Sequence, residues 1–375
     1  MSPATTATSA PNPVLAGITE SREQGLLVLA PSARKHGRRV LFINSYGGSE
    51  VWAKVKQGLL PPHHMWGCIE LVRLGYEVAL AEPLHHFNYR RPFPHDLRLL
   101  RVVRSWLRPD DIVYCGHTLL FWVPLLRALL GRRRHLVSMT YAREELDFAR
   151  AHRGIIALTP AAADQARKIA PQAKVAHLAW GCDLGFFPQL AYDPRWFLSC
   201  GITHRDFPTL SQAARQSPHA LRLICPGLPP GIEWSPNVTV IDGGKGWNHQ
   251  KSAVSYQELF HEHYAGSIAS LIILKHDPVQ YTAVGFTNLL EALALARPVI
   301  VTRTGAIPGE IDVEAAGCGL FAPPNDPAAL AALITQLGRD PAAAQAMGQK
   351  GRALAERHYN IGRYAEGLHQ FFASL

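Results

Sequence analysis

The chain has 375 residues, of which 47% are hydrophobic and 18% charged, so it is long enough for two globular domains with sizeable cores. No apolar run reaches the ~18–20 residues of a membrane-spanning helix. The net charge of +9 comes from the first half, because residues 1–190 hold 24 Lys and Arg against 14 Asp and Glu, whereas residues 191–375 hold 14 against 15.

The N-terminal segment and the cysteines indicate the compartment. The chain starts with "MSPATTATSAPNPVLAG", which lacks the basic start and apolar core of a signal peptide, and residues 1–37 are expected to form a flexible tail. The six cysteines are scattered without a CxxC pair, which disfavours a disulfide framework and a zinc site. A cytoplasmic protein is therefore expected.

From residue 38 onward, short apolar runs alternate with helical patterns, which predicts α/β domains with parallel sheets built from βαβ units. Strands are expected at 38–46, 76–83, 110–117, 134–140, 154–160 and 174–181, and then at 195–201, 221–227, 237–244, 269–276 and 297–303. Helices are expected at 63–75, 96–107, 161–170, 207–217, 288–296 and 326–338. The proline-bearing segment 186–195 is typical of a linker, so we expect one domain over 38–190 and another over 191–375.

Ligands of open parallel sheets bind outside the carboxyl ends of the strands, so residues that follow strands are the site candidates. Gly285, Phe286 and Thr287 open a helix, and a helix N-terminus with a glycine is typical of a phosphate site. Glu291 lies one turn beyond Thr287, where its carboxylate would accept hydrogen bonds from a sugar hydroxyl. The alternative is an exposed glutamate on an ordinary helix.

One cation follows each of two strands at the same expected edge. Arg205 comes after the strand 195–201, and Lys275 ends the strand 269–276. Arginine and lysine commonly bind diphosphates, arginine through its bidentate fork and lysine as a point charge. The alternative is a pair of surface cations. Lys245 and Lys251 are further candidates for the same task.

The first half contributes glycines and histidines to the opposite side of this opening. Gly47 and Gly48 follow the first strand, so a backbone approach to a ligand or a plain turn would both explain them. His117 ends the strand 110–117, where a ligand-facing role competes with a structural one. His63 and His64 could reach the same opening, but a role at a helix start is preferred for this pair.

Several motifs are absent from the sequence. There is no GxGxxG after the first strand and no GxxxxGK[ST], which disfavours a nicotinamide site and a Walker-type phosphate loop. A DxD motif and metal-spaced His/Asp clusters are also missing, so no metal ligands are assigned and no cofactor is expected.

Several segments resemble the GT-B glycosyltransferases, and specifically the family-4 retaining nucleotide-sugar transferases. They include "GFTNLLEALALARPVIVTRTGAIPGEI", "AAGCGLFAPPNDPAALAALI", "IIALTPAAADQARK", "KVAHLAWGCDLGFFP" and "GGSE". The resemblance runs from about residue 40 to the C-terminus. It implies two Rossmann-like domains that face a central cleft, an N-terminal acceptor domain and a C-terminal donor domain, with the last helix packed back on the first domain.

The resemblance also assigns roles to individual residues. Glu291 matches the second acid of a paired-glutamate motif and is expected to hold the donor ribose, while Ala283 stands where the first acid would be. Arg205 matches an arginine expected on the diphosphate, and Lys275 would replace a lysine that this chain lacks. His117 matches a histidine near the transferred sugar, and Gly47 and Gly48 match the loop that faces the diphosphate.

The implied function is transfer of a hexose from a nucleotide diphosphate sugar, the co-substrate, to a hydroxyl of a lipid or glycan acceptor, with retention and without a metal. A sugar-nucleotide epimerase of the same fold is one alternative, although it would need more carboxylates than Glu291 in the cleft. A non-enzymatic basic binding protein is another. Nucleic acid is not an expected partner, because no aromatic-plus-basic module is present.

The basic first half suggests where such an enzyme would work. Residues 96–107 place arginines on one side of a helix and apolar residues on the other, and Arg90, Arg91, Arg127, Arg132 and Arg134 add to this charge. The arginines of the stripe are Arg98, Arg101, Arg104 and Arg108. Reversible docking on the inner face of an anionic membrane is expected, and a solvated basic face or a soluble anionic glycan are the alternatives.

Overall fold

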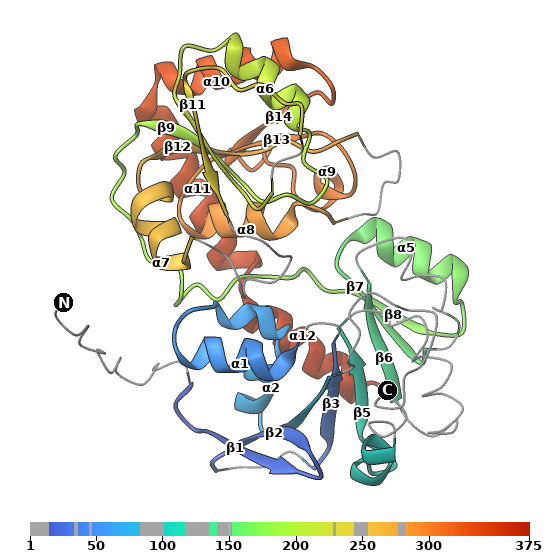
Figure 1. Cartoon of the computed structure of the whole chain (residues 1–375). Coiled ribbons are helices and arrows are strands. Elements are labelled where there is room, and N and C mark those ends of the chain that lie inside the picture. Colours follow the sequence, from blue (N-terminus) through green and yellow to red (C-terminus); the bar gives the residue numbers. More distant parts are fainter. Residues whose placement is uncertain are drawn as a thin grey trace, which may run out of the picture.

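The computed structural model describes residues 15–33, 37–44, 47–82, 101–116, 135–140, 150, 152–227, 230–243, 254–276 and 283–375. These residues form two α/β lobes, each built around one sheet (Figure 1). The first lobe is made mainly from the first half of the chain, and the second lobe from the second half (Figure 1).

The first sheet has the strand order β1-β2-β4-β3-β5-β6-β7-β8. β1 pairs with β2 and β2 with β4 in antiparallel fashion, and the other neighbours are parallel. The strands are β1 Ile18–Glu23, β2 Leu26–Pro31, β3 Arg39–Ile43, β4 Glu77–Ala81, β5 Ile112–Cys115, β6 His135–Thr140, β7 Gly154–Ala157 and β8 Lys174–His177. β3 to β8 lie within the six ranges expected from the sequence. β3 to β7 are buried along most or all of their length, and buried parallel strands have continuous apolar runs.

The second sheet is parallel throughout, with the order β11-β10-β9-β12-β13-β14. Its strands are β9 Trp196–Cys200, β10 Leu221–Cys225, β11 Val238–Asp242, β12 Ser267–Ile272, β13 Val299–Thr302 and β14 Gly319–Ala322. β14 was not expected from the sequence. It is a short strand at the sheet edge, and Gly319 fits there because a Cβ atom at this position would lie 2.5 Å from the carbonyl oxygen of Val299.

Helices cover these sheets, and none of those in the described part of the chain combines the length and apolarity needed to cross a bilayer. In the first lobe they include α1 Gly48–Lys56, the 3-10 helix η2 Pro62–Met65, α2 Cys68–Arg73 and α5 Pro160–Ile169, and residues 101–106 are also helical. The rest are α6 Phe207–Arg215, α7 Tyr256–Glu258, the π-helix η6 Leu259–Tyr264, α8 Phe286–Ala294, α9 Ile307–Glu310, α10 Pro327–Arg339, α11 Pro341–His358 and α12 Ile361–Ala373.

The expectation of a flexible tail over residues 1–37 is wrong for the hairpin β1-β2. β2 is the apolar run "LLVLAP", and its first four residues are buried against the sheet. Gln24 and Gly25 both have positive φ angles, which is the two-residue turn that antiparallel strands favour. The indole N–H of Trp106 donates to Glu23 at 3.0 Å and Lys56 pairs with Glu20 at 2.8 Å, so side chains also fix the hairpin.

The single helix expected at 63–75 is also wrong, because it is divided into η2 and α2. Trp66 and Gly67 between them have φ angles of 53° and 82°, which a continuous right-handed helix excludes. A Cβ atom at Gly67 would lie 3.0 Å from Leu368, so α12 approaches closely at this break. The break turns η2, with His63 and His64, away from the axis of α2.

The chain returns to the first lobe at its end. α12 packs against α2 (Figure 1). The hydroxyl groups of Tyr364 in α12 and Tyr114 in β5 lie 2.8 Å apart. Just before α12, the amide of Cys182 donates to Tyr359 and the amide of Ile361 donates to Cys182, each at 2.9 Å. The segment just before the linker and the C-terminal segment are thus joined by backbone hydrogen bonds.

In each sheet the chain places two successive parallel connections on opposite sides of one strand, and this locates the crevice. The chain proceeds from β3 outward to β4 and then returns to the other side of β3 with β5. In the second sheet it proceeds from β9 to β11 and returns beside β9 with β12. Ligands of such sheets bind at the carboxyl ends of the strands at this switch point, here β3 and β5, and β9 and β12.

Candidate functional site

The loops after β9 and β12 lie next to each other at the carboxyl ends of the central strands of the second sheet. The amide of Lys275 donates to the carbonyl of His204, and the amide of Asp206 donates to Ile273, each at 2.9 Å. Arg205 and Lys275 therefore lie in two loops that are tied together at the switch point. The side chain of Lys275 is exposed, whereas Arg205 is buried.

Most N–H groups of the Arg205 guanidinium donate hydrogen bonds to other residues of the protein. Its Nε and Nη2 donate to the carbonyl of Cys200 at 3.2 and 3.0 Å, and Nη1 donates to Thr203 at 3.0 Å. Nη2 also bonds the side chain of Asn288 in α8. Four of the five N–H groups of an arginine are thus used, and one at Nη1 remains. Burial lowers the pKa of Arg205 to about 10, which keeps it charged at neutral pH.

The N-terminus of α8 lies beside this arginine. Gly285 precedes the helix with a φ angle of 87°, and a Cβ atom there would lie 3.1 Å from Ile272, so both conformation and space favour glycine. No side chain caps the helix, and the amides of Thr287 and Asn288 have no acceptor in the described part of the chain. Phe286 is buried and anchors this end.

Glu291 lies further along α8 and is buried, so it is not the exposed glutamate of an ordinary helix that the sequence analysis gave as the alternative. It is 3% exposed, and the hydroxyl of Tyr256 donates to its Oε1 at 3.1 Å. Nε2 of His63, from η2 of the first lobe, lies 3.7 Å from the same oxygen. Both contacts are to Oε1, so neither occupies Oε2. A buried carboxylate with one oxygen held in place can accept hydrogen bonds through the other.

His63, His64 and Glu291 place three potential metal ligands within 4.8 Å of one another, which the sequence analysis missed. The amide of Asp183 donates to Nδ1 of His63 at 3.3 Å, so the proton of the neutral ring is on Nε2. A protonated nitrogen offers no lone pair to a metal, so this arrangement favours a hydrogen-bonded cluster. The sequence analysis noted that His63 and His64 could reach the opening but preferred a role at a helix start, and it did not pair them with Glu291.

Gly47 and Gly48 lie at the start of α1, after β3. Gly48 is buried, and a Cβ atom there would be 3.6 Å from a carboxylate oxygen of Glu82. That carboxylate accepts from the amide of Ser49, in the first turn of α1. The anion-binding end of α1 thus already has an acidic partner, which the sequence analysis did not foresee. His117, Lys245 and Lys251 lie outside the described residues.

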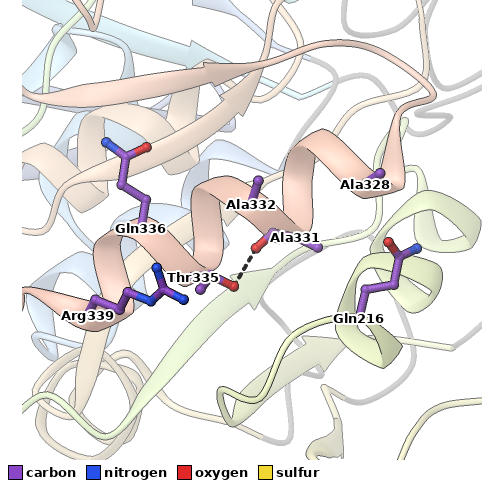
Figure 2. Close-up of a pocket in the computed structure, with 7 residues that line it drawn as sticks. All are labelled: Gln216, Ala328, Ala331, Ala332, Thr335, Gln336 and Arg339. Carbon is purple, nitrogen blue, oxygen red and sulfur yellow. Dashed lines mark hydrogen bonds between the residues drawn. The ribbon is translucent and has the colours of Figure 1, made fainter.

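A groove on the second lobe is unrelated to these strand ends. It lies between α6 and α10, and Gln216, Ala328, Thr335 and Arg339 are among the residues that line it (Figure 2). The hydroxyl of Thr335 donates to the carbonyl of Ala331 within the helix at 2.8 Å (Figure 2). Arg339 is the one ionisable side chain among the described residues that line the groove, so no cluster there could carry chemistry.

Two Rossmann-like lobes with paired switch points define a GT-B architecture, and comparisons with known proteins agree. Residues 278–354, which contain α8, match the family model "Glycosyl transferases group 1". No curated protein sequence matches the chain significantly. The match covers 77 of the 375 residues, and together with the fold it supports a glycosyltransferase.

Solved structures share the fold at low identity. Sucrose-phosphate synthase from Thermosynechococcus elongatus is 15% identical with a TM-score of 0.61, and the alignment covers 90% of this chain and 99% of that one. HepE from Anabaena, in complex with UDP and glucose, is 13% identical with a TM-score of 0.61 and coverages of 90% and 100%. Trehalose-6-phosphate synthase from Burkholderia multivorans is 12% identical with a TM-score of 0.62 and coverages of 90% and 99%.

Proposed function

We propose that the protein transfers a hexose from a nucleotide diphosphate sugar to a hydroxyl group of a lipid or glycan acceptor, with retention of configuration. One observation carries the proposal. Arg205, the uncapped N-terminus of α8 and the buried carboxylate of Glu291 lie together at the switch point of the second sheet. These groups suit a diphosphate and a ribose, the two parts that all nucleotide diphosphate sugars share.

Negative charge grows on the diphosphate as its bond to the sugar breaks. The remaining N–H of Arg205, the side chain of Lys275 and the first amides of α8 would stabilise this charge. Each preorganised donor of this kind can lower the barrier by ~3–4 kcal/mol. Since Arg205 is fixed by Cys200 and Thr203, its orientation would need little reorganisation during the reaction.

The acceptor side belongs to the first lobe in this proposal. An oxygen of the leaving diphosphate takes the proton of the acceptor hydroxyl, so attack occurs on the face from which the diphosphate departs. His117 would orient the transferred sugar. Glu82 follows β4, and its carboxylate accepts from the amide of Ser49 at the start of α1. This disfavours binding of a donor phosphate at that helix end, because the phosphate and the carboxylate would compete for the same amide.

The reaction is proposed to be independent of a metal. Two groups of potential ligands occur among the described residues, and each includes a histidine whose Nδ1 accepts a hydrogen bond. His63 accepts from Asp183, and His263 accepts from Arg222, which can only donate. In both histidines the ring proton is then on Nε2, which disfavours metal binding.

Binding of nucleoside diphosphates tests the proposal directly. We expect UDP, ADP or GDP to raise the melting temperature, because a ligand at 100 times its Kd stabilises a protein by ~2.7 kcal/mol. The shift should persist in EDTA, and the corresponding nucleosides, which lack the diphosphate, should give much less. Thermal denaturation with each compound measures this. The absence of a shift with every nucleoside diphosphate would exclude the proposed donor site, and a shift that requires a divalent metal would exclude the metal-free mechanism.

The acceptor class is proposed from the basic face of the first lobe. Arg101, Arg104 and Arg108 are exposed, and Val103 and Leu107 on the other side of this segment are buried. Each arginine near an anionic surface contributes ~1 kcal/mol. We therefore expect salt-sensitive binding to vesicles with anionic lipids and little binding to neutral ones.

Sedimentation with vesicles measures this binding. Replacing Arg101 and Arg104 together by glutamine should lower the partition coefficient about tenfold or more, whereas the same change at the exposed Arg339 and Arg357 of the second lobe should have little effect. Equal recovery on neutral and anionic vesicles would contradict a membrane-associated acceptor.

A further inference from the structure

His63 is enclosed between the two lobes and the linker. It lies in η2, it is 0% exposed, and its ring stacks on Phe187 with centroids 5.6 Å apart. The ring of Trp180 meets it edge-on at 5.3 Å. These aromatic side chains leave the histidine ring little freedom to turn, so its two nitrogens have fixed directions.

The two nitrogens have different environments. Nδ1 accepts the hydrogen bond from the amide of Asp183, so Nε2 carries the proton. Nε2 has no hydrogen-bond partner in the described part of the chain, and Oε1 of Glu291 lies 3.7 Å away. A donor from the first lobe therefore faces a buried carboxylate of the second lobe, at a distance slightly longer than a hydrogen bond.

A buried donor without a partner is costly, typically by ~1–3 kcal/mol. A movement of the lobes that shortens the gap by roughly 0.5 Å would form a hydrogen bond of ordinary length. Tyr256 already holds the same oxygen of Glu291 at 3.1 Å, and its hydroxyl lies 3.1 Å from Nε2 of His64. The carboxylate is thus placed between a tyrosine of its own lobe and a histidine of the other, with Oε2 outside both contacts.

We propose that His63 is a positioning residue for the donor site. Its Nε2–H donates to Oε1 of Glu291 across the lobe boundary and sets Oε2 toward the ribose hydroxyls of the nucleotide. The inference rests on the proposed function, since it assigns Glu291 to the ribose. It adds that donor recognition depends on the approach of the first lobe, and that the tautomer of His63 is set by the amide of Asp183, just before the linker.

The test compares nucleotides that differ only in the ribose hydroxyls. Calorimetry measures the Kd of UDP, ADP and GDP, and then that of the 2′,3′-dideoxy analogue of whichever binds the wild type best. We expect the wild type to prefer the ribose form by at least tenfold. His63→Phe should weaken binding of the ribose form about tenfold and leave binding of the dideoxy form within twofold, because only the ribose form uses Glu291.

Two further variants separate positioning from a structural role. His63→Gln keeps an amide donor near the place of Nε2 and should retain a ribose preference within about threefold of the wild type. This variant also tests the inference if His63→Phe does not fold. His263→Phe is the matched control, because His263 is also buried, its Nδ1 accepts from Arg222 and its Nε2 has no partner among the described residues. It should leave the ribose preference unchanged.

The outcomes are distinguishable. If the wild type binds none of the nucleotides, the proposed function fails and the inference fails with it. Suppose that the wild type prefers the ribose form. If His63→Phe then weakens binding of the ribose and dideoxy forms equally, or weakens binding of neither, the inference alone is overturned. A ribose preference that falls in His63→Gln or His263→Phe as far as in His63→Phe would also overturn it. Stoichiometric metal in the purified protein that disappears in His63→Phe would overturn it in favour of a metal site.

Discussion

Replacing Glu291 by glutamine should lower kcat/KM for sugar transfer by roughly 100-fold, since a hydrogen bond to a charged acceptor contributes ~1.5–3 kcal/mol and the carboxylate is expected to accept from the ribose. The amide oxygen can keep the hydrogen bond from Tyr256 at the position of Oε1. The amide nitrogen then replaces Oε2, so a donor would face the ribose hydroxyls. Steady-state kinetics with the nucleotide sugar measure the loss.

The same change at Glu366 is a suitable control, because this glutamate is also on a helix but is exposed. The melting temperature of Glu291→Gln shows whether the fold is retained. Wild-type kinetics for Glu291→Gln would exclude Glu291 from the donor site. Arg205→Ala is less informative, because the buried guanidinium bonds Cys200, Thr203 and Asn288, so its loss should lower stability as well as activity.

The second large effect concerns stability and pH. Glu70 in α2 is 6% exposed, and its Oε2 has no hydrogen-bond partner among the described residues. Burial raises the pKa of Glu70 to about 7, with the charge of Asp183 adding to the rise, while a backbone hydrogen bond and Arg73 oppose it. In the unfolded chain the pKa is near 4.5. The folded state therefore binds more protons than the unfolded state between these values.

Since the folded state holds this proton more tightly, stability should fall as the pH rises from about 4.5 to 7 and stay lower above that. The loss from this one group is ~3 kcal/mol. Glu70→Gln removes the buried charge and should be more stable than the wild type at pH 8, with the difference much smaller near pH 4.5. Urea denaturation at both pH values measures this. The same stability difference at both pH values would contradict a buried, proton-binding Glu70, and Glu366→Gln should show little difference at either.

The strands of both sheets were largely predictable from the sequence. β3 and β12, for example, are buried along their whole length, so their apolar runs are visible without knowledge of their partners. The hairpin β1-β2 was missed because β1, "ITESRE", is mostly exposed and owes its conformation to pairing with β2. β14 was missed because a four-residue strand with a glycine has little local signal.

The candidate site was predictable in its positions but not in its contacts. Arg205 and Lys275 follow strands in the sequence, and the switch point brings their loops together. Gly285 opens a helix, as its sequence context predicted. The burial of Arg205 and Glu291 was not predictable, because it depends on groups far away in the chain. Asn288 is 83 residues from Arg205, and Tyr256 is 35 residues from Glu291.

The sequence by itself determined the alternation of strands and helices, the asymmetry of charge and the residues that follow the strands, because these are local or compositional properties. Only the tertiary structure decided that His63 of the first lobe faces Glu291 of the second, and that Glu82 takes the amide of Ser49 at the start of α1. The physical reason is that such contacts form between elements whose distance is set by packing of the lobes, the linker and α12, none of which is encoded in a short stretch of residues.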